Sequence, residues 1–190
     1  MKKLYLLLCS CTALAQAPTD ANALQPPFAG SLSGFVDASN PSHAGVFVEH
    51  YRKKAVLKDF HRSRIYQLAG TQLQYDAPGY QIQGRGFELG LGSRQYWEKG
   101  RASGLYSENL LTYGQVDVVD RDKDFSGTYA YWSMFNTRLG YKAYLSKTWS
   151  VEPYAGVMWK WEVRGRGQVD NIYVDNWVWS AGVKLGYSFP

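Results

Sequence analysis

Cysteine is nearly absent from this chain of 190 residues, because only Cys9 and Cys11 occur and both precede residue 12. The rest of the chain therefore offers no disulfide, no zinc-binding thiolates and no thiol nucleophile. Long apolar runs are missing too, which excludes membrane-spanning helices. The three histidines, His43, His50 and His61, lack metal-ligand spacing, so neither a metal site nor a cofactor is predicted.

The sequence also lacks a concentrated cluster of charge of one sign. The formal net charge is +5, and the basic residues are spread along the chain rather than gathered into one stripe. Nucleic-acid binding proteins concentrate basic residues on one face, so nucleic acid is not an expected partner.

The amino terminus has the organisation of a signal peptide. A basic start, Met1–Lys3, precedes a short apolar run, Leu4–Cys9, and small residues that end at Ala15. We predict that residues 1–15 are a signal peptide cleaved after Ala15, which places the protein outside the cytoplasm. An alternative is a lipoprotein leader with Cys11 as the lipidated residue.

Strict alternation of apolar and polar residues marks the last forty residues. From Trp149 to Val163, and again from Trp177 to Phe189, every second residue is apolar or proline, and the charges lie between them. A period of two residues predicts β-strands with one apolar and one polar face. Both segments are longer than the strands of most soluble sheets.

Six further strand candidates precede these two, and no amphipathic helix interrupts the series. Eight strands joined by hairpins predict an all-β fold, a closed up-and-down antiparallel transmembrane β-barrel, because lipid cannot satisfy open strand edges. The barrel domain would span residues 30–190 after an irregular N-terminal arm at 16–29. The six candidates are Gly30–Asp37, Gly45–Lys53, Arg64–Tyr75, Gln83–Trp97, Gly104–Val118 and Thr128–Leu145.

Two details concern the connections and the register. Long outer loops are expected near residues 119–127 and 165–175. The alternation is imperfect in the middle strands, and we expect β-bulges at Gly70, Gly84 or Gly86 to correct it. On the sixth strand, Tyr129 and Tyr131 are expected to face outward.

The two faces of the strands predict two sets of residues. The inward set would be a mutually neutralising network that fills a narrow lumen, since an eight-stranded barrel leaves room only for side chains. Its predicted members are Glu49, Glu88, Arg94, Glu108, Arg138, Lys142, Glu152, Lys160, Glu162, Arg164 and Lys184. The outward set would be a girdle at the lipid interfaces. Its predicted members are Trp97, Trp149, Trp159, Trp161, Trp177 and Trp179.

Several segments carry a resemblance to the small OmpA/OmpX-type outer-membrane barrels, and to an uncharacterised family of outer-membrane barrels of unknown function. The resemblance implies an integral protein of the bacterial outer membrane with no assigned activity, in contact with the lipid bilayer and lipopolysaccharide. The final strand resembles the signal read by the outer-membrane assembly machinery, although Pro190 follows the usual terminal aromatic residue. The segments are Val48–Arg52, Gly86–Gly90, Arg94–Trp97, Gly104–Tyr106, Arg138–Leu145 and Gly182–Phe189.

Some barrels of this size are enzymes, and the residues that two of them need are missing here. The run from Ser93 to Tyr106 is similar to the lipid A palmitoyltransferase, but the Asp-Ser pair that the enzyme needs is missing. The lipid A deacylase carries a late His-x-Ser, whereas no histidine follows His61 here. We therefore predict a non-catalytic barrel with a role in envelope structure or in surface contacts through its outer loops.

Two alternatives stay open. A lipid-modifying enzyme would depend on His43, expected in the first outer loop, and on an acidic residue nearby. A secreted lipocalin-like carrier of small ligands would have the opposite arrangement, with polar residues outside and apolar residues within. It would require Lys160 and Lys184 to face solvent.

Overall fold

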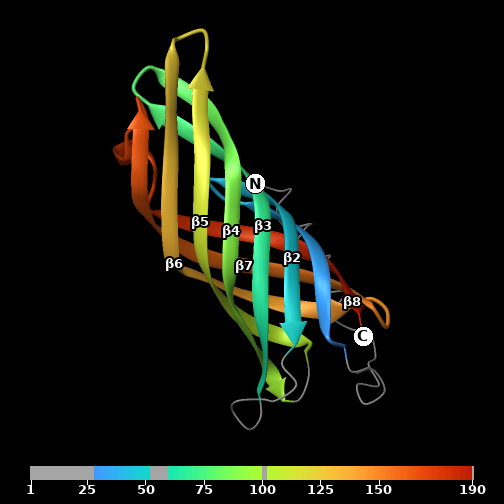
Figure 1. Ribbon diagram of the computed structural model, residues 1–190. Coiled ribbons are helices and arrows are strands. Elements are labelled where there is room, and N and C mark those ends of the chain that lie inside the picture. The colour runs from blue at the N-terminus through green and yellow to red at the C-terminus, as the bar shows by residue number, and fades with distance from the viewer. Residues whose placement is uncertain (1–27, 52–59, 100–101, 190) are drawn as a thin grey trace, which may run out of the picture.

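The computed structural model describes residues 28–51, 60–99 and 102–189 (Figure 1). The predicted signal peptide, Cys11 and residues 16–27 of the predicted arm lie outside this part of the chain. Eight strands and one short 3₁₀ turn, η2 (Asn171–Tyr173), make up the described structure. The strands are β1 (Gly30–Ala38), β2 (Ser42–Tyr51), β3 (Phe60–Ala77), β4 (Tyr80–Lys99), β5 (Gly104–Asp120), β6 (Phe125–Tyr144), β7 (Trp149–Gly167) and β8 (Trp177–Phe189).

The strands form one closed barrel in sequence order, which confirms the predicted all-β up-and-down topology. Each strand pairs antiparallel with the next, and β1 closes the ring against β8, with Gly30 opposite Phe189. Closure satisfies the backbone of both edge strands along this pairing. We name the end at Gly30 and Phe189 the terminal end, and the opposite end the hairpin end.

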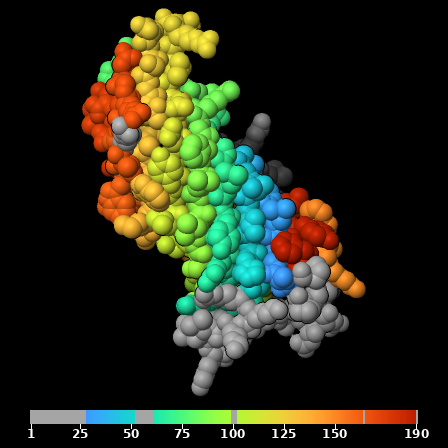
Figure 2. All heavy atoms as spheres, viewed as in Figure 1, coloured from blue at the N-terminus to red at the C-terminus, as the bar shows by residue number. Residues whose placement is uncertain are grey.

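The strands differ greatly in length. β1 and β2 have 9 and 10 residues, whereas β4 and β6 have 20 each. As a result β3 to β6 project beyond β1 and β2 at the hairpin end (Figure 1), and their side chains form a solid column there (Figure 2). No helix among the described residues is long and apolar enough to cross a membrane, a finding that concerns helices alone.

The projecting strands correct the prediction of long outer loops. β5 continues to Asp120 and β6 starts at Phe125, so only a four-residue turn remains of the loop expected at 119–127. β7 likewise continues to Gly167 and takes up the first part of the loop expected at 165–175. Polar residues predicted to be loop are strand because the neighbouring hairpins satisfy their backbone groups.

The β-bulges lie elsewhere than predicted. Pairing is regular at Gly70, Gly84 and Gly86. The β6–β7 register instead shifts twice: β6 has an extra residue between Trp132 and Phe135, and β7 has one between Glu162 and Arg164. One extra residue in a strand sends the following side chains to the other face. The prediction that Tyr129 and Tyr131 face outward is therefore wrong, and both are fully buried inside the barrel.

Apolar layers fill the lumen at both ends. At the hairpin end the inner faces of the projecting strands form a cluster with the β7–β8 connection, which includes Tyr75, Phe125 and Val174. At the terminal end Tyr51, Tyr96 and Tyr106 pack together. Between these layers lie the ionic side chains.

Candidate functional site in the barrel lumen

Most of the predicted inward charges lie inside the barrel. Glu162 is an exception, because it is only half-buried, and the side chain of Arg164 is not described. The other nine are buried: Glu49, Glu88, Arg94, Glu108, Arg138, Lys142, Glu152, Lys160 and Lys184. Two buried polar residues, Asp37 and His43, were missed as members of the network.

Arg94 is the centre of the network. Its Nη1 lies 3.0 Å from Oε2 of Glu49 and 2.9 Å from Oε2 of Glu152. Its Nε and Nη2 donate to Oε2 of Glu108 at 2.9 and 2.7 Å. The guanidinium carbon also lies 3.9 Å from the ring centroid of Tyr106. A single arginine on β4 thus binds carboxylates from β2, β5 and β7, as the planar guanidinium fork allows.

Two lysines complete the pairing of the same carboxylates. Nζ of Lys142 lies 3.1 Å from Glu49 Oε2 and 3.1 Å from Glu152 Oε1. Nζ of Lys184 donates to Oε1 of Glu108 at 2.6 Å. All three carboxylates therefore face at least two cations, the arrangement needed to offset their desolvation.

Hydroxyl groups supply further hydrogen bonds to this cluster. Tyr96 donates to Oε1 of Glu49 at 2.9 Å, and Ser63 donates to the same oxygen at 2.5 Å. Tyr51 accepts a hydrogen bond from Lys142 at 2.8 Å. The tyrosine layer at the terminal end is therefore bonded directly to the ionic layer above it.

A second cluster surrounds His43 nearer the hairpin end. Nε2 of His43 lies 3.2 Å from Oε2 of Glu88, and Nδ1 lies 3.7 Å from Oδ1 of Asp37. Tyr131 donates to Glu88 at 2.8 Å, and Tyr154 donates to Asp37 at 2.9 Å. His43 therefore joins β1, β2 and β4 across the lumen.

The buried position of His43 corrects the prediction that it lies in the first outer loop. β2 starts at Ser42 rather than at Gly45, so His43 is a strand residue whose side chain points inward. The sequence did contain a signal, because His43 is in phase with the buried Phe47 and Glu49.

The hydrogen bonds around Ser39 decide what this cluster can do chemically. Its Oγ lies 2.5 Å from Oδ1 of Asp37, 2.5 Å from the carbonyl oxygen of Pro41 and 3.2 Å from Nδ1 of His43. The first two neighbours are acceptors, so the single hydroxyl hydrogen belongs to one of them. Nδ1 of His43 then donates to Ser39, opposite to an imidazole that activates a serine nucleophile.

Gln67 connects the two clusters. Its Nε2 donates to Glu88 at 2.8 Å, and its Oε1 accepts from Nη1 of Arg138 at 2.9 Å. Nη1 of Arg138 lies 3.7 Å from Oε1 of Glu108. The ionic side chains thus form one continuous network from the terminal end towards the hairpin end.

Lys160 lies at the upper limit of this network. Within the described part of the chain, no carboxylate is within ion-pair distance of it. Its Nζ lies 5.6 and 5.5 Å from the ring centroids of Tyr129 and Tyr131 and donates to the carbonyl of Asn40 at 3.4 Å. Aromatic faces and one carbonyl therefore hold this cation.

The buried charges of the described residues balance. The network holds five carboxylates and five lysines or arginines in addition to His43. The acids are Asp37, Glu49, Glu88, Glu108 and Glu152, and the bases are Arg94, Arg138, Lys142, Lys160 and Lys184. A balanced, directly bonded interior is typical of packing rather than of a pore lined by one sign of charge. No group of His, Cys, Asp and Glu side chains in the described ranges could hold a metal ion.

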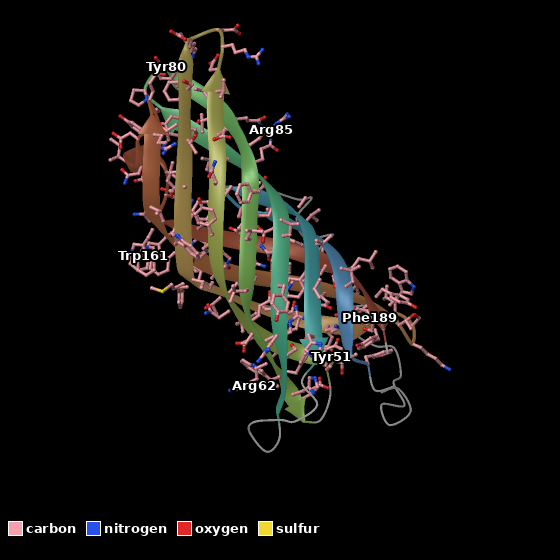
Figure 3. The ribbon with its side chains drawn as sticks, in the orientation of Figure 1. Tyr51, Arg62, Tyr80, Arg85, Trp161 and Phe189 are labelled. Carbon is pink, nitrogen blue, oxygen red and sulfur yellow. The ribbon has the colours of Figure 1, made fainter. Side chains whose placement is uncertain are left out.

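Aromatic side chains mark two levels on the outside of the barrel. Trp159 of β7 pairs with Trp177 of β8, and Trp149 pairs with Tyr187, ten residues further along each strand. Ten residues of a strand tilted by about 40° rise about 25 Å along the axis. The predicted girdle residues Trp97, Trp149, Trp161, Trp177 and Trp179 are exposed, and Trp159 is half-buried. In Figure 3, Trp161 lies at the left of the tilted barrel and Phe189 at the lower right, at the terminal end.

Between these two levels lies an apolar belt of exposed side chains. Its members include Leu32, Val36, Val46, Tyr66, Leu68, Leu89, Leu91, Leu139, Val183 and Leu185. Beyond the upper aromatic level the outward face becomes polar, with Gln72 and Gln74 on β3 and Gln83 and Arg85 on β4. Arg85 projects sideways from the column in Figure 3.

Comparison with known proteins shows similarity to solved structures. No protein-family model and no curated protein match the chain. Among solved structures, the N-terminal β-barrel domain of OprF from Pseudomonas aeruginosa is similar, with a TM-score of 0.47 and 14% identity. The match covers 84% of this chain and 96% of that domain. The eight-stranded barrel itself rests on the strand pairing described above.

Proposed function

We propose that this protein is an integral β-barrel of the bacterial outer membrane, without catalytic activity, that serves envelope structure and surface contacts. The observation that carries the proposal is the apolar belt bounded by two aromatic levels. Its height of about 25 Å is that of the outward apolar band of outer-membrane barrels. An exposed apolar surface of this extent is unfavourable in water.

The direction of the side chains argues against the lipocalin-like carrier. Lys160 and Lys184 are 0% exposed, whereas Val183 is 40% exposed on the outside. A soluble carrier requires the reverse, with an apolar cavity and a charged exterior.

The lumen supports a structural role rather than transport. Ionic side chains and a small apolar cluster that includes Phe47 occupy its middle, and clusters rich in tyrosine or apolar residues close both ends, as expected for eight strands. The enzymatic alternative has less support, because Nδ1 of His43 donates to Ser39 instead of accepting its proton.

Surface contacts would involve the projecting hairpins. With both termini in the periplasm, the column of β3 to β6 extends beyond the membrane towards the cell exterior, and its base meets lipopolysaccharide. β8, which ends on the outward aromatic Phe189, is the strand that the assembly machinery would read.

Cell fractionation combined with gel mobility tests this proposal. We expect the protein in the outer-membrane fraction, and a shift in mobility between unheated and boiled samples, because closed membrane barrels resist detergent until heated. Recovery as a soluble periplasmic protein with no mobility shift would contradict the proposal.

A further inference from the structure

Three basic side chains lie together on the outside of the barrel near the terminal end. Arg62 and Arg64 occupy successive outward positions of β3, and His50 of β2 is the cross-strand neighbour of Arg64. Figure 3 shows Arg62 at this end of the barrel. We name these three residues the basic patch.

The basic patch has no anionic partner within the described residues. No ion pair involves His50, Arg62 or Arg64 there, and His50 and Arg64 make no side-chain hydrogen bond with described residues. Nε and Nη2 of Arg62 donate to Oε1 of Gln95 at 3.1 and 2.9 Å, and Nη1 has no hydrogen-bond partner among the described residues. Gln95 thus orients one guanidinium without neutralising it.

Arg64 lies at the edge of the apolar belt, where an arginine without an anionic partner is energetically unfavourable. Arg64 is next to Tyr66 on the outward face of β3, and Tyr66 belongs to the apolar belt. On β4, Arg64 pairs with Ser93, four residues before the girdle residue Trp97. A lipid-facing arginine is unfavourable inside the belt and tolerated near the interface, where its long side chain reaches the headgroups.

We propose that the basic patch binds the phosphate of an anionic glycerophospholipid headgroup, one that carries a net negative charge, in the leaflet around the terminal end. The proposal rests on the membrane location proposed above. Two neighbouring guanidinium groups present several N–H donors to phosphate oxygens, and His50 adds a ring donor beside them. Bound phosphate would supply the negative charge that the described protein residues do not.

Lipid-dependent stability tests the proposal. The protein is refolded into vesicles of phosphatidylcholine, with or without phosphatidylglycerol, and unfolded with urea. We expect phosphatidylglycerol to raise the urea midpoint of the native protein, and the Arg62→Gln/Arg64→Gln variant to lose that increase. The matched control Arg121→Gln/Arg166→Gln, which removes two exposed arginines from the hairpin end, should keep it.

The possible outcomes separate the two proposals. Failure of the native protein to insert into either vesicle contradicts the membrane location. If the protein inserts normally and phosphatidylglycerol raises the urea midpoint equally in both double variants, or in neither, the lipid site is contradicted and the membrane location is not. Inorganic phosphate added to phosphatidylcholine vesicles should leave the midpoint unchanged; an increase as large as that from phosphatidylglycerol would indicate a general anion site and overturn the lipid assignment.

Discussion

At the scale of single residues, Arg94 has the largest structural consequence. Its guanidinium is fully buried and contacts Glu49, Glu108 and Glu152. A buried ion pair adds little net stability by itself, but removing one partner leaves the other charge desolvated and unpaired. Replacing Arg94 would leave Glu49 and Glu152 with Lys142 as their one remaining described ion-pair partner, and Glu108 with Lys184 and Arg138.

We expect Arg94→Met to lower the free energy of unfolding by about 3–5 kcal/mol or more, because it leaves buried carboxylates underpaired. Urea unfolding of the refolded barrel measures this change. Arg121→Met is the matched control, since Arg121 is exposed in the β5–β6 turn, and should change stability by less than about 0.5 kcal/mol. Similar losses in the two variants would show that the buried network is not responsible.

The contacts of His43 distinguish a structural role of this side chain from a catalytic one. Both ring nitrogens face oxygens that accept hydrogen bonds, from Ser39 and Asp37 on one side and Glu88 on the other. Because Nδ1 donates to Ser39, it offers that hydroxyl no lone pair with which to take up a proton.

We therefore expect His43→Gln and Ser39→Ala to leave lipid A unchanged in mass spectrometry of cells that produce each variant. His43→Gln should still lower the urea midpoint, because Asp37 and Glu88 lose the imidazole that lies between them. The enzymatic alternative would instead be supported if cells with either variant had the lipid A profile of cells that lack the protein.

At the scale of strands, inward tyrosines fit over glycines on the adjacent strand. A Cβ atom at Gly114 of β5 would collide with the ring of Tyr131 of β6. Gly140 has the same relation to Tyr106, and Gly182 to Tyr154. The missing Cβ lets each ring lie flat against the wall, which suits a lumen with little free volume.

Gly114→Val should lower the urea midpoint because it displaces Tyr131, whose hydroxyl is bonded to Glu88. Gly34→Val is the matched control, since a Cβ atom at Gly34 meets no atom within 4 Å. In a Tyr131→Ala background, Gly114→Val should cost less than in the native protein. Simple additivity of the two changes would argue against the proposed contact.

At the scale of the whole molecule, the lumen is closed by three successive layers. Tyrosines close the terminal end, ion pairs occupy the middle, and the apolar cluster of the projecting strands closes the hairpin end. An aqueous channel requires a wider barrel of about 16 strands or more.

We expect the reconstituted protein to show no porin-like conductance in planar bilayers, because no layer of its lumen is lined by water-exposed charge of one sign. A 16-stranded porin in the same bilayer is the positive control. Stable conductance steps of porin size from this protein would show that the side-chain layers of the lumen separate under voltage. That result would contradict a packed lumen.

Several features of the fold followed from the sequence. Strand β8 occurs at its predicted limits, and β7 has its predicted start and faces, because their period-two alternation is uninterrupted. Nine of the residues placed on the inward face are buried charges, including three on the less regularly alternating β4 and β5. Closure into a barrel followed from eight strands with no other element to cover their edges.

The sequence alone determined the strand series, the outward apolar face and most of the inward charges, because alternation depends only on residues that are close together in the chain. Only the tertiary structure decided the register of β6, the projecting column and the neighbours of His43. Each depends on pairing between distant segments. A one-residue bulge reverses the faces of a strand, and no local pattern around Tyr129 and Tyr131 reveals it.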